Sequence, residues 1–373
     1  MSKNFVSVGV SIVDIVGYPI ESIPESEGTE LVQSIRMCAA GTAAAPAVIA
    51  ARSGQHSTLI GAVGTDNTGD FMLHVLEKEG VNTALIQRRE DMPTATTMLP
   101  INSRGERPNW HMPGACLLLE PTEEVKAAIT AADHVHWGGV GLLFNFDGEV
   151  AAGILQQARA NGATTTADLI APGDHTLDCI KAVAPHLDWF MPSIDEALSI
   201  SGTGTVAEAG AFFMELGAAG CVIKCGGEGA YICNTEGLAE QVPVIADVQV
   251  VDTSGCGDSF CAGFNVGLAH GFDPLEALTA HCSWVKFGAD GHQLAVGVAL
   301  LDAVQPAGTR RAAAVDLGTG RHRFPCPLHL PDRFAQRSAQ RVVLERRLEG
   351  HQGVHPGPGH EPATLGRGLQ RAR

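Results

Sequence analysis

Short apolar runs alternate along the chain with segments in which apolar residues recur every three or four positions, most regularly from about residue 131 onward. Runs such as ATTTADLI have the length of buried strands, and segments such as GEVAAGILQQARANG have the period of amphipathic helices. Strands and helices that alternate at this spacing build βαβ units. We therefore expect an α/β fold of three layers, in which helices cover both faces of a mostly parallel central sheet.

Several elements follow from the same pattern. The β-branched run at 5–16 predicts one strand, and AYICN with LAEQVPVI predicts a hairpin. Polar residues alternate through 29–37 and 94–101, which is typical of strands with one solvent-facing side. We expect VQVV to be a strand that leads into a helix from 258 to about 270, and 273–291 to form the last helix.

Composition indicates a globular protein with a substantial core, since 45% of the 373 residues are hydrophobic and 18% are charged. No run of 18 or more apolar residues occurs, so we expect no membrane span. The apolar N-terminal stretch contains Asp14 and lacks a small-residue cleavage pattern, which favours a core strand over a signal peptide. Ten cysteines without a CxxC pair indicate reduced thiols and a cytoplasmic protein.

The charge is divided between two parts of the chain. Residues 1–302 hold 13 Lys and Arg against 36 Asp and Glu, which predicts repulsion of nucleic acid. Residues 303–373 hold 12 Arg, no Lys and five acidic residues, with many Pro and Gly. This basic tail is either disordered and bound to a polyanion or partner, or the product of a reading frame lost in a GC-rich gene. We favour the frame loss.

The stretch VDTSGCGDSF is the first candidate for chemistry. Gly255 and Gly257 let the backbone approach a ligand closely, and the amides at the start of the following helix form a site for an anion. Asp258 is then either a helix cap or a base that deprotonates a substrate hydroxyl. A carboxylate beside an anion site suits phosphoryl transfer, but this segment alone leaves both interpretations open.

Four segments together resemble the PfkB sugar kinases, the ribokinase-like family. DTSGCGD is similar to the D-T-x-G-x-G-D signature in all five fixed positions. GAVGTDNTGDFMLHVLEKEGV matches a second, Gly-rich signature at Gly61, Gly64, Asp66 and Gly69. CAAGTAAAPAVIAARSG resembles the sugar-binding turn and helix, and DWFMPSIDEA resembles the P-N-x-x-E segment. Because the resemblance runs in order from Phe5 to Gly291, the chain is identified as a member.

The resemblance implies an ATP-dependent kinase that uses Mg²⁺ to phosphorylate a hydroxyl of a small sugar or sugar acid. Its domain would be residues 1–302, a ribokinase-like fold with a small β-sheet lid made from segments 17–38 and 92–114. Exposed strand edges invite pairing, so the lid allows a homodimer. A nucleoside kinase of the same fold and a non-catalytic sugar-binding regulatory protein are the alternatives.

The resemblance also implies a role for each matching residue. Asp258 is the catalytic base, and the amides of Gly255, Cys256 and Gly257 form the anion hole, with Cys256 serving as a small packing residue. The positions implied for substrate are Asp14, Gly41, Thr42 and the lid residue Arg107. The positions implied for the nucleotide are Ser193, Glu196, Lys224, Gly226, Gly227 and Gly229. Glu196 would position Mg²⁺ through water, and Asp252 would support a monovalent cation such as K⁺.

Two further groups of side chains have a structural and a functional interpretation. In 100–115, Arg104, Arg107 and His111 are placed to bind a carboxylate or phosphate and Trp110 to stack on a sugar, although a solvated hairpin is favoured. His134 and His136 share one side of a strand. They lack a third ligand, so we expect hydrogen-bonded strand histidines rather than a metal site.

Three residues depart from the family pattern: Ala40, Ala45 and Ser193. Ala40 replaces the first glycine of the sugar turn, and Ala45 stands where many relatives have asparagine. These two changes predict a different sugar pocket. Ser193 replaces the asparagine of P-N-x-x-E, which makes the positioning of magnesium less secure.

Overall fold

Among the residues described by the structure, nine strands form the main sheet in the order β13-β12-β11-β10-β9-β8-β1-β4-β5. The computed structural model describes residues 2–244, 255–281, 286–287 and 294–295, and the fold is given for these. The strands are β1 (Asn4–Gly9), β4 (His56–Gly64), β5 (Ile86–Arg89), β8 (His134–Gly138), β9 (Thr164–Asp168), β10 (Trp189–Phe190), β11 (Gly220–Lys224), β12 (Ala230–Asn234) and β13 (Ala239–Val242). All pairs from β5 to β11 are parallel, and the predicted hairpin β12–β13 is antiparallel at the edge.

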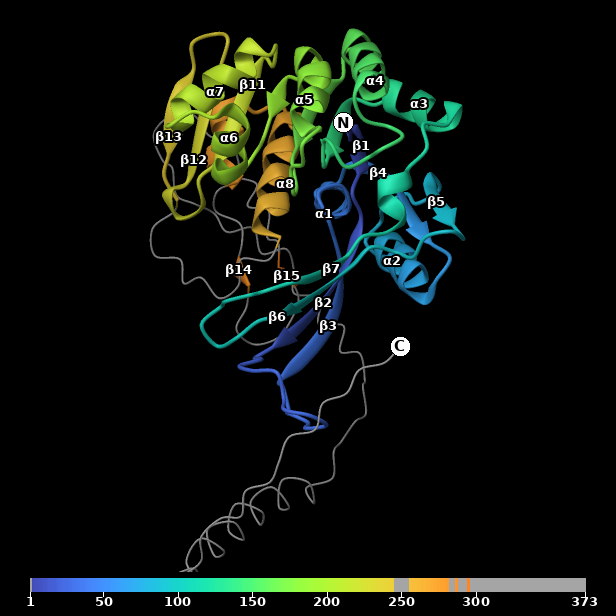
Figure 1. Cartoon of the computed structure of the whole chain (residues 1–373). Helices are drawn as coiled ribbons and strands as arrows, with labels where there is room; N and C mark the ends of the chain where they lie inside the picture. Colours follow the sequence, from blue (N-terminus) through green and yellow to red (C-terminus); the bar gives the residue numbers. More distant parts are fainter. Residues whose placement is uncertain (1, 245–254, 282–285, 288–293, 296–373) are drawn as a thin grey trace, which may run out of the picture. The chain divides into compact units, whose positions relative to one another are not determined.

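Helices cover both faces of this sheet (Figure 1). One group packs with the side chains of one sheet face: α1 (Ala44–Arg52), α2 (Asn67–Lys78), α8 (Cys256–Ala269) and α9 (Pro274–His281). The other group is α3 (Glu123–Thr130), α4 (Glu149–Ala160), α5 (Thr176–Val183), α6 (Ile194–Ser201) and α7 (Val206–Glu215). Alternation along β4 shows the division, because Leu59 packs with the first group and Ile60 with the second. The predicted three-layer fold is confirmed.

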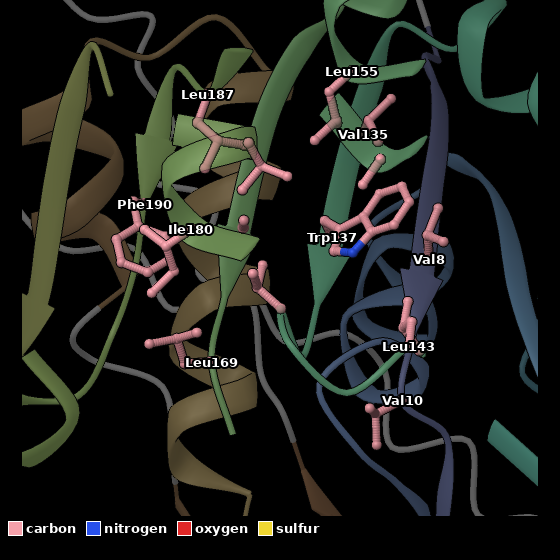
Figure 2. Close-up of a cluster of buried hydrophobic side chains, with 14 of the residues drawn as sticks. Val8, Val10, Val135, Trp137, Leu143, Leu155, Leu169, Ile180, Leu187 and Phe190 are labelled. Atoms are coloured by element: carbon pink, nitrogen blue, oxygen red, sulfur yellow. The ribbon is translucent and has the colours of Figure 1, made fainter. Parts of the chain in front are cut away.

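The largest core cluster lies between the sheet and α3–α7 (Figure 2). Trp137 on β8 is fully buried and meets Phe146 edge-on, with ring centroids 4.9 Å apart. Its indole N–H donates to Asp147 Oδ1 at 3.0 Å, so the polar atom of this side chain is paired inside the core. Phe190 and Phe213 make a similar contact at 4.8 Å. These contacts fix the strands whose carboxyl ends carry the polar residues described below.

A separate four-stranded sheet has the order β3-β2-β6-β7, with β2 (Ile12–Tyr18), β3 (Ser34–Ala40), β6 (Thr96–Pro100) and β7 (Trp110–Met112). The prediction of one strand over 5–16 is wrong, because β1 ends at Gly9 and the chain enters the small sheet as β2. Gly9 has φ +134°, and a Cβ there would lie 2.0 Å from Gly138 O. Asp14 therefore lies within β2 of the small sheet, not at the end of a first core strand.

Strand register divides the small sheet into two faces. Met37, Ile15, Met98 and Trp110 form one cross-strand row, of which Met37, Met98 and Trp110 are 42%, 54% and 52% exposed. The next row, on the other face, is Cys38, Asp14, Thr97 and His111. One face of the small sheet is therefore apolar and exposed, and the other carries polar groups.

The last predicted helix is shorter than expected. α9 ends at His281, and residues 286–287 (β14) pair with residues 294–295 (β15). The strand expected at VQVV and the tail 303–373 lie outside the described residues. The short helices η1 (Ala115–Leu118), η2 (Ala184–His186) and η3 (Gly226–Glu228) complete the elements. Within the described ranges, no helix has both the length and the apolar character that crossing a membrane requires.

Candidate active site

The first turn of α8 has the backbone geometry that an anion site requires. Gly255 is the N-cap residue, with φ +68°, and among the described residues no side chain caps the helix. Cys256, Gly257 and Asp258 follow in the first turn, where backbone N–H groups lack acceptors within the helix. Asp258 is thus not the N-cap, and the interpretation of this carboxylate as a simple cap is wrong. The helix dipole and these amides favour a bound anion.

The carboxyl group of Asp258 is held in an unusual electrostatic environment. Burial raises its pKa to about 7, helped by the negative charges of Asp168, Asp14 and Glu196, while the positive charge of Lys224 opposes the shift. Such a group exchanges its proton near neutral pH, which suits a general base. Four charged side chains from four elements therefore act on the start of α8.

Lys224 at the end of β11 is paired with a residue that the sequence did not single out. Its Nζ lies 2.6 Å from Oδ1 of Asp168, and the side chains are 13% and 1% exposed. Cys261 of α8 completes the cluster, 3.4 Å from Nζ and 3.3 Å from Asp168 Oδ2. Burial alone would lower the pKa of Lys224, but Asp168 and Cys261 raise it above its ordinary value, so the ammonium stays charged. The available signal was that Asp168 ends a strand at the sheet edge where ligands bind.

Ser193 and Glu196 form a capping box at the start of α6. Ser193 donates to Glu196 Oε2 from its N–H at 2.8 Å and its hydroxyl at 2.6 Å, and the Glu196 N–H returns a bond at 3.4 Å. Burial raises the pKa of Glu196, the Ser193 bonds oppose the shift and the charge of Asp168 adds to it. Serine at this position therefore still orients the glutamate.

The carboxylates at the carboxyl ends of the main-sheet strands suit a divalent cation that would also be bound by a second molecule. Within the described residues, no group of three His, Cys, Asp or Glu side chains could hold a metal by itself. Glu196 nevertheless has a raised pKa, because it is partly buried and lies near the negative charge of Asp168. A hard cation such as Mg²⁺ prefers carboxylate oxygens and would relieve this repulsion, so the residues fit the ion. Asp252 lies outside the described residues.

The turn expected to contact the sugar joins β3 to α1. Gly41 has φ +103°, and a Cβ there would lie 2.6 Å from Val10 O, so the turn requires glycine. Thr42 is 2% exposed, and its hydroxyl has no hydrogen-bond partner in the described part of the chain. Ala40 closes β3, and Ala45 lies in the first turn of α1.

His136 connects this turn to α8. Its Nε2 lies 3.0 Å from Thr42 O, which requires Nε2 to carry the proton. Its Nδ1 then accepts from Thr166 Oγ1 at 3.0 Å and from Asn265 Nδ2 of α8 at 3.1 Å. Burial lowers the pKa of His136 to about 4, so the ring is neutral. A buried polar network thus links the candidate sugar turn to the helix that carries Asp258.

His134 differs from His136. Its ring stacks on Phe5 with centroids 5.0 Å apart, and neither ring nitrogen has a partner within the described residues. Burial lowers its pKa to about 3. The expectation of a hydrogen-bonded strand histidine is therefore confirmed for His136 and wrong for His134.

The polar face of the small sheet brings Asp14 beside Thr97, its register partner on β6. His111 of β7 lies 3.0 Å from Thr97 Oγ1 through Nδ1, and partial desolvation of the ring lowers its pKa. Trp110 points to the opposite face from His111, so the two cannot contact one sugar together. Arg104 pairs with Glu106 at 2.8 Å near the tip of the hairpin.

Arg107 is exposed in the loop between β6 and β7. In the turn expected to contact the nucleotide, Gly226 and Gly229 have φ +57° and +90°, and a Cβ at Gly229 would meet Val242 O at 2.0 Å. At Gly226 and Gly227 a Cβ would meet nothing within 4 Å. This turn after Lys224 therefore leaves its backbone accessible to a ligand.

The sequence profile of the "pfkB family carbohydrate kinase" matches residues 2–282. The chain belongs to this family. It is therefore a carbohydrate kinase by family, a phosphotransferase with an alcohol group as acceptor.

Individual pfkB relatives are distant in sequence. A 2-dehydro-3-deoxygluconokinase from Bacillus subtilis (strain 168) is 28% identical over 240 residues, which cover 61% of this chain and 73% of that protein. A fructokinase from Klebsiella pneumoniae is 28% identical over 269 residues, which cover 69% and 85%.

Solved structures share the ribokinase-like fold. An Arabidopsis thaliana ribokinase complexed with ribose and ATP has a TM-score of 0.64 at 22% identity, covering 76% of this chain and 91% of that chain. An Escherichia coli structure in complex with ATP and Mg²⁺ has a TM-score of 0.62 at 24% identity, covering 75% and 90%.

In this pfkB kinase the second signature has a structural role. Asp66 is the N-cap of α2 and accepts from the N–H of Gly69 at 2.8 Å and from Thr94 N at 2.8 Å. A Cβ at Gly69 would lie 2.2 Å from Gly64 O, so this contact requires glycine. The signature thereby fastens the segment that leads into β6 to the main sheet.

Proposed function

We propose that this pfkB kinase transfers the terminal phosphoryl group of ATP to a hydroxyl of a small sugar or sugar acid. The observation that carries the proposal is the placement of Asp258, whose carboxyl group titrates near neutral pH, in the same helix turn as the Gly255–Gly257 amides. The names of the two relatives, a sugar-acid kinase and a fructokinase, support this class of acceptor.

In the proposed reaction, Asp258 accepts the proton of the acceptor hydroxyl as its oxygen forms a bond to phosphorus. The bond between that phosphorus and the bridging oxygen of ADP breaks, and ADP leaves with the electron pair. The amides of Gly255, Cys256 and Gly257 stabilise the negative charge on the transferring group. Such stabilisation by preorganised hydrogen-bond donors is often the largest contribution to catalysis.

The nucleotide is proposed to lie along Lys224 and the turn formed by Gly226, Gly227 and Gly229, beside Ser193. Glu196 would hold Mg²⁺ through water, and the bound ion would neutralise phosphate charge. A monovalent cation such as K⁺ beside Asp252 is a further proposal, on a residue outside the described ranges.

The acceptor is proposed to bind between the Gly41–Thr42 turn and Asp14, with Arg107 reaching it from the β6–β7 loop. The small sheet would act as a lid of a kinase domain spanning 1–302. It extends beyond the expected lid segments 17–38 and 92–114, because β2 begins at Ile12 and β3 ends at Ala40. Its polar face carries Asp14 and would cover the sugar.

The opposite face of the small sheet is proposed to pair with a second copy of this chain. Met37, Met98 and Trp110 expose apolar surface in one row, and such rows are typical of association sites. Light scattering of the purified protein tests this proposal, because a monomer at micromolar concentration would contradict it.

A second acceptor class has one observation in its favour. An aminoimidazole riboside kinase from Salmonella typhimurium is 25% identical over 264 residues, which cover 68% of this chain and 80% of that protein. A nucleoside or other riboside is therefore the alternative substrate. The two classes differ in whether the acceptor carries a base at its anomeric carbon.

A substrate panel tests the proposed function. Release of ADP from ATP and Mg²⁺ is measured with pentoses, hexoses, keto-deoxy sugar acids and nucleosides. Turnover that depends on a free sugar or sugar acid supports the proposal, and preference for a nucleoside favours the alternative. Binding of a sugar without ADP release from any acceptor would contradict a kinase and indicate a regulatory sugar-binding protein.

A further inference from the structure

Lys224 and Asp168 form the most deeply buried ion pair among the described residues, with 13% and 1% of their side chains exposed. The other ion pairs of this part of the chain are on the surface, where each has at least one partner that is more than 30% exposed. Desolvating two charges offsets most of their attraction, so a buried pair contributes little net stability. Its position in the active site is therefore informative.

Lys224 lies where several elements of the candidate site meet. Its backbone N–H donates to Pro192 O at 3.0 Å, and its backbone bridges Ser193, so β11 is tied to the start of α6. Its side chain reaches α8, where a Cβ added to Gly257 would lie 3.9 Å from Nζ. The ammonium is thus beside Gly257, the last residue of the turn that is proposed to bind phosphate.

Asp168 is itself held in place. Its Oδ1 accepts from the backbone N–H of Leu169 at 2.7 Å, and its Oδ2 accepts from the thiol of Cys261 at 3.3 Å. Its backbone carbonyl accepts from the N–H groups of Gly139 and Val140, each at 3.1 Å. Hydrogen bonds to both carboxylate oxygens and to the carbonyl hold Asp168 in one position. The ion pair with Asp168 therefore fixes the ammonium of Lys224, whose side chain is flexible on its own.

We propose that Asp168 is a positioning residue for phosphoryl transfer: it fixes the Lys224 ammonium beneath the first turn of α8, where that charge supports the Gly255–Gly257 anion site and the Asp258 carboxylate. This inference rests on the proposed function. It assigns to Asp168 a role through Lys224, and it explains why a charged pair occupies a site that apolar side chains could fill.

The pair has a consequence that a purely structural contact lacks. The charged groups that face Asp258 are Asp168 from β9, Lys224 from β11, Asp14 from β2 and Glu196 from α6. Removing the negative charge at 168 favours ionisation of Asp258, and removing the positive charge at 224 disfavours it. Single variants of the two partners should therefore move the pH dependence of turnover in opposite directions.

The test compares Asp168→Asn, Lys224→Met and the double variant with wild type, using ATP and the acceptor found in the substrate panel. We expect each single variant to lower kcat/KM on the order of a hundredfold, comparable to loss of a preorganised charge at the transferring group. The acid limb of the pH profile should move to lower pH in Asp168→Asn and to higher pH in Lys224→Met. In the double variant the limb should return toward wild type.

Lys181→Met is the matched control, because Lys181 pairs with Asp178 on the exposed surface of α5. It should leave both rate and pH profile unchanged. Limbs that stay in place, or move in the same direction, in both single variants would overturn the proposal. If Lys224→Met does not fold, as judged by circular dichroism, Lys224→Arg keeps the charge and should restore the wild-type limb, and a displaced limb there also contradicts the proposal.

A binding measurement separates this inference from the proposed function. If wild type releases no ADP with any acceptor, the proposed function fails. Calorimetric titration with inorganic phosphate then tests, without any turnover, whether the Lys224–Asp168 pair supports anion binding. Phosphate affinity that falls at least tenfold in both single variants supports it, and unchanged affinity in either variant overturns it.

Discussion

The end of the main sheet and the small sheet treat polar and apolar groups in opposite ways. At the end of the main sheet, charged side chains are buried and joined to one another, as in the Lys224–Asp168 pair. On the small sheet, apolar side chains such as Met98 and Trp110 are about half exposed. Charges held in fixed positions are typical of sites that stabilise a transition state, whereas exposed apolar surface is typical of sites that bind a ligand or another protein. This difference agrees with the proposals that the first region carries catalysis and that the second covers the substrate or associates with another subunit.

The largest effect should come from Asp258→Asn, which removes the proposed base from the main-sheet region. We expect turnover to fall by about 10³-fold, within the range for loss of a general base, as measured by ADP release. The fold should be retained, because the amide has the same shape and removes a buried charge. Asp188→Asn on the Arg159 ion pair is the control for charge removal elsewhere. Near-normal turnover in Asp258→Asn would remove this residue as the base.

The second prediction concerns pH. The folded pKa of Asp258 is about 7 against an ordinary 3.8, so kcat/KM should rise with pH until about 7 and then level. The contribution of Asp258 to stability has the opposite trend, because the folded state binds the extra proton between about pH 4 and 7. That contribution is full below the unfolded pKa and is lost as pH rises through 7.

A matched comparison isolates the stability part of this prediction. Urea denaturation at pH 5 and pH 8 should show a smaller difference in Asp258→Asn than in wild type, because asparagine does not titrate. An equal difference in the two proteins would show that Asp258 has an ordinary pKa.

A smaller effect is expected at the junction of the two regions. Gly41→Ala places a Cβ 2.6 Å from Val10 O at φ +103°, which should cost about 1–3 kcal/mol of stability. The displaced turn should raise KM for the acceptor more than KM for ATP. Gly54→Ala is the control, since Gly54 has φ +82° with open space around it. Equal changes in the two KM values would contradict a contact between this turn and the acceptor.

The smallest effect on chemistry should come from the small sheet. Met98→Lys places a charge in the exposed apolar row, which should raise the dimer dissociation constant with little change in the kcat of the subunit. Sedimentation velocity over a range of concentrations measures this change. Glu106→Lys is the control, because Glu106 is an exposed residue of the same hairpin. Equal dissociation constants for Met98→Lys and wild type would exclude this face from the interface.

The turn at the start of α8 was predictable because its information is local. Two glycines and a helix pattern within ten residues predicted the start of α8, which the structure has at Cys256, and the signature led to the proposal of Asp258 as the base. Asp168 was not predicted, because its partner Lys224 lies 56 residues away and the two meet only when parallel strands end at the same sheet edge. The local sequence around either residue does not indicate that the two side chains are in contact.

The position of Asp14 could not be predicted for a different reason. A continuous apolar run over 5–16 has the pattern of one strand, and only the approach of Gly9 to Gly138 shows where the chain leaves the main sheet. The two histidines of β8 make the same point: His136 has three hydrogen-bond partners, whereas the ring nitrogens of His134 have none among the described residues. Neighbours from distant segments decided each outcome.

The passage from β1 to β2 limits how far the small sheet can move. Val10 is hydrogen-bonded on both sides, donating to Gly138 O and accepting from Ala43 N, so rotation must occur in the few residues that follow it. Asp14 is four residues further on, about 13 Å along an extended strand. A tilt of about 10° about this pivot would displace Asp14 by only ~2 Å. The small sheet is therefore anchored to a central strand with a short lever arm, which suits fine adjustment around an acceptor better than wide opening.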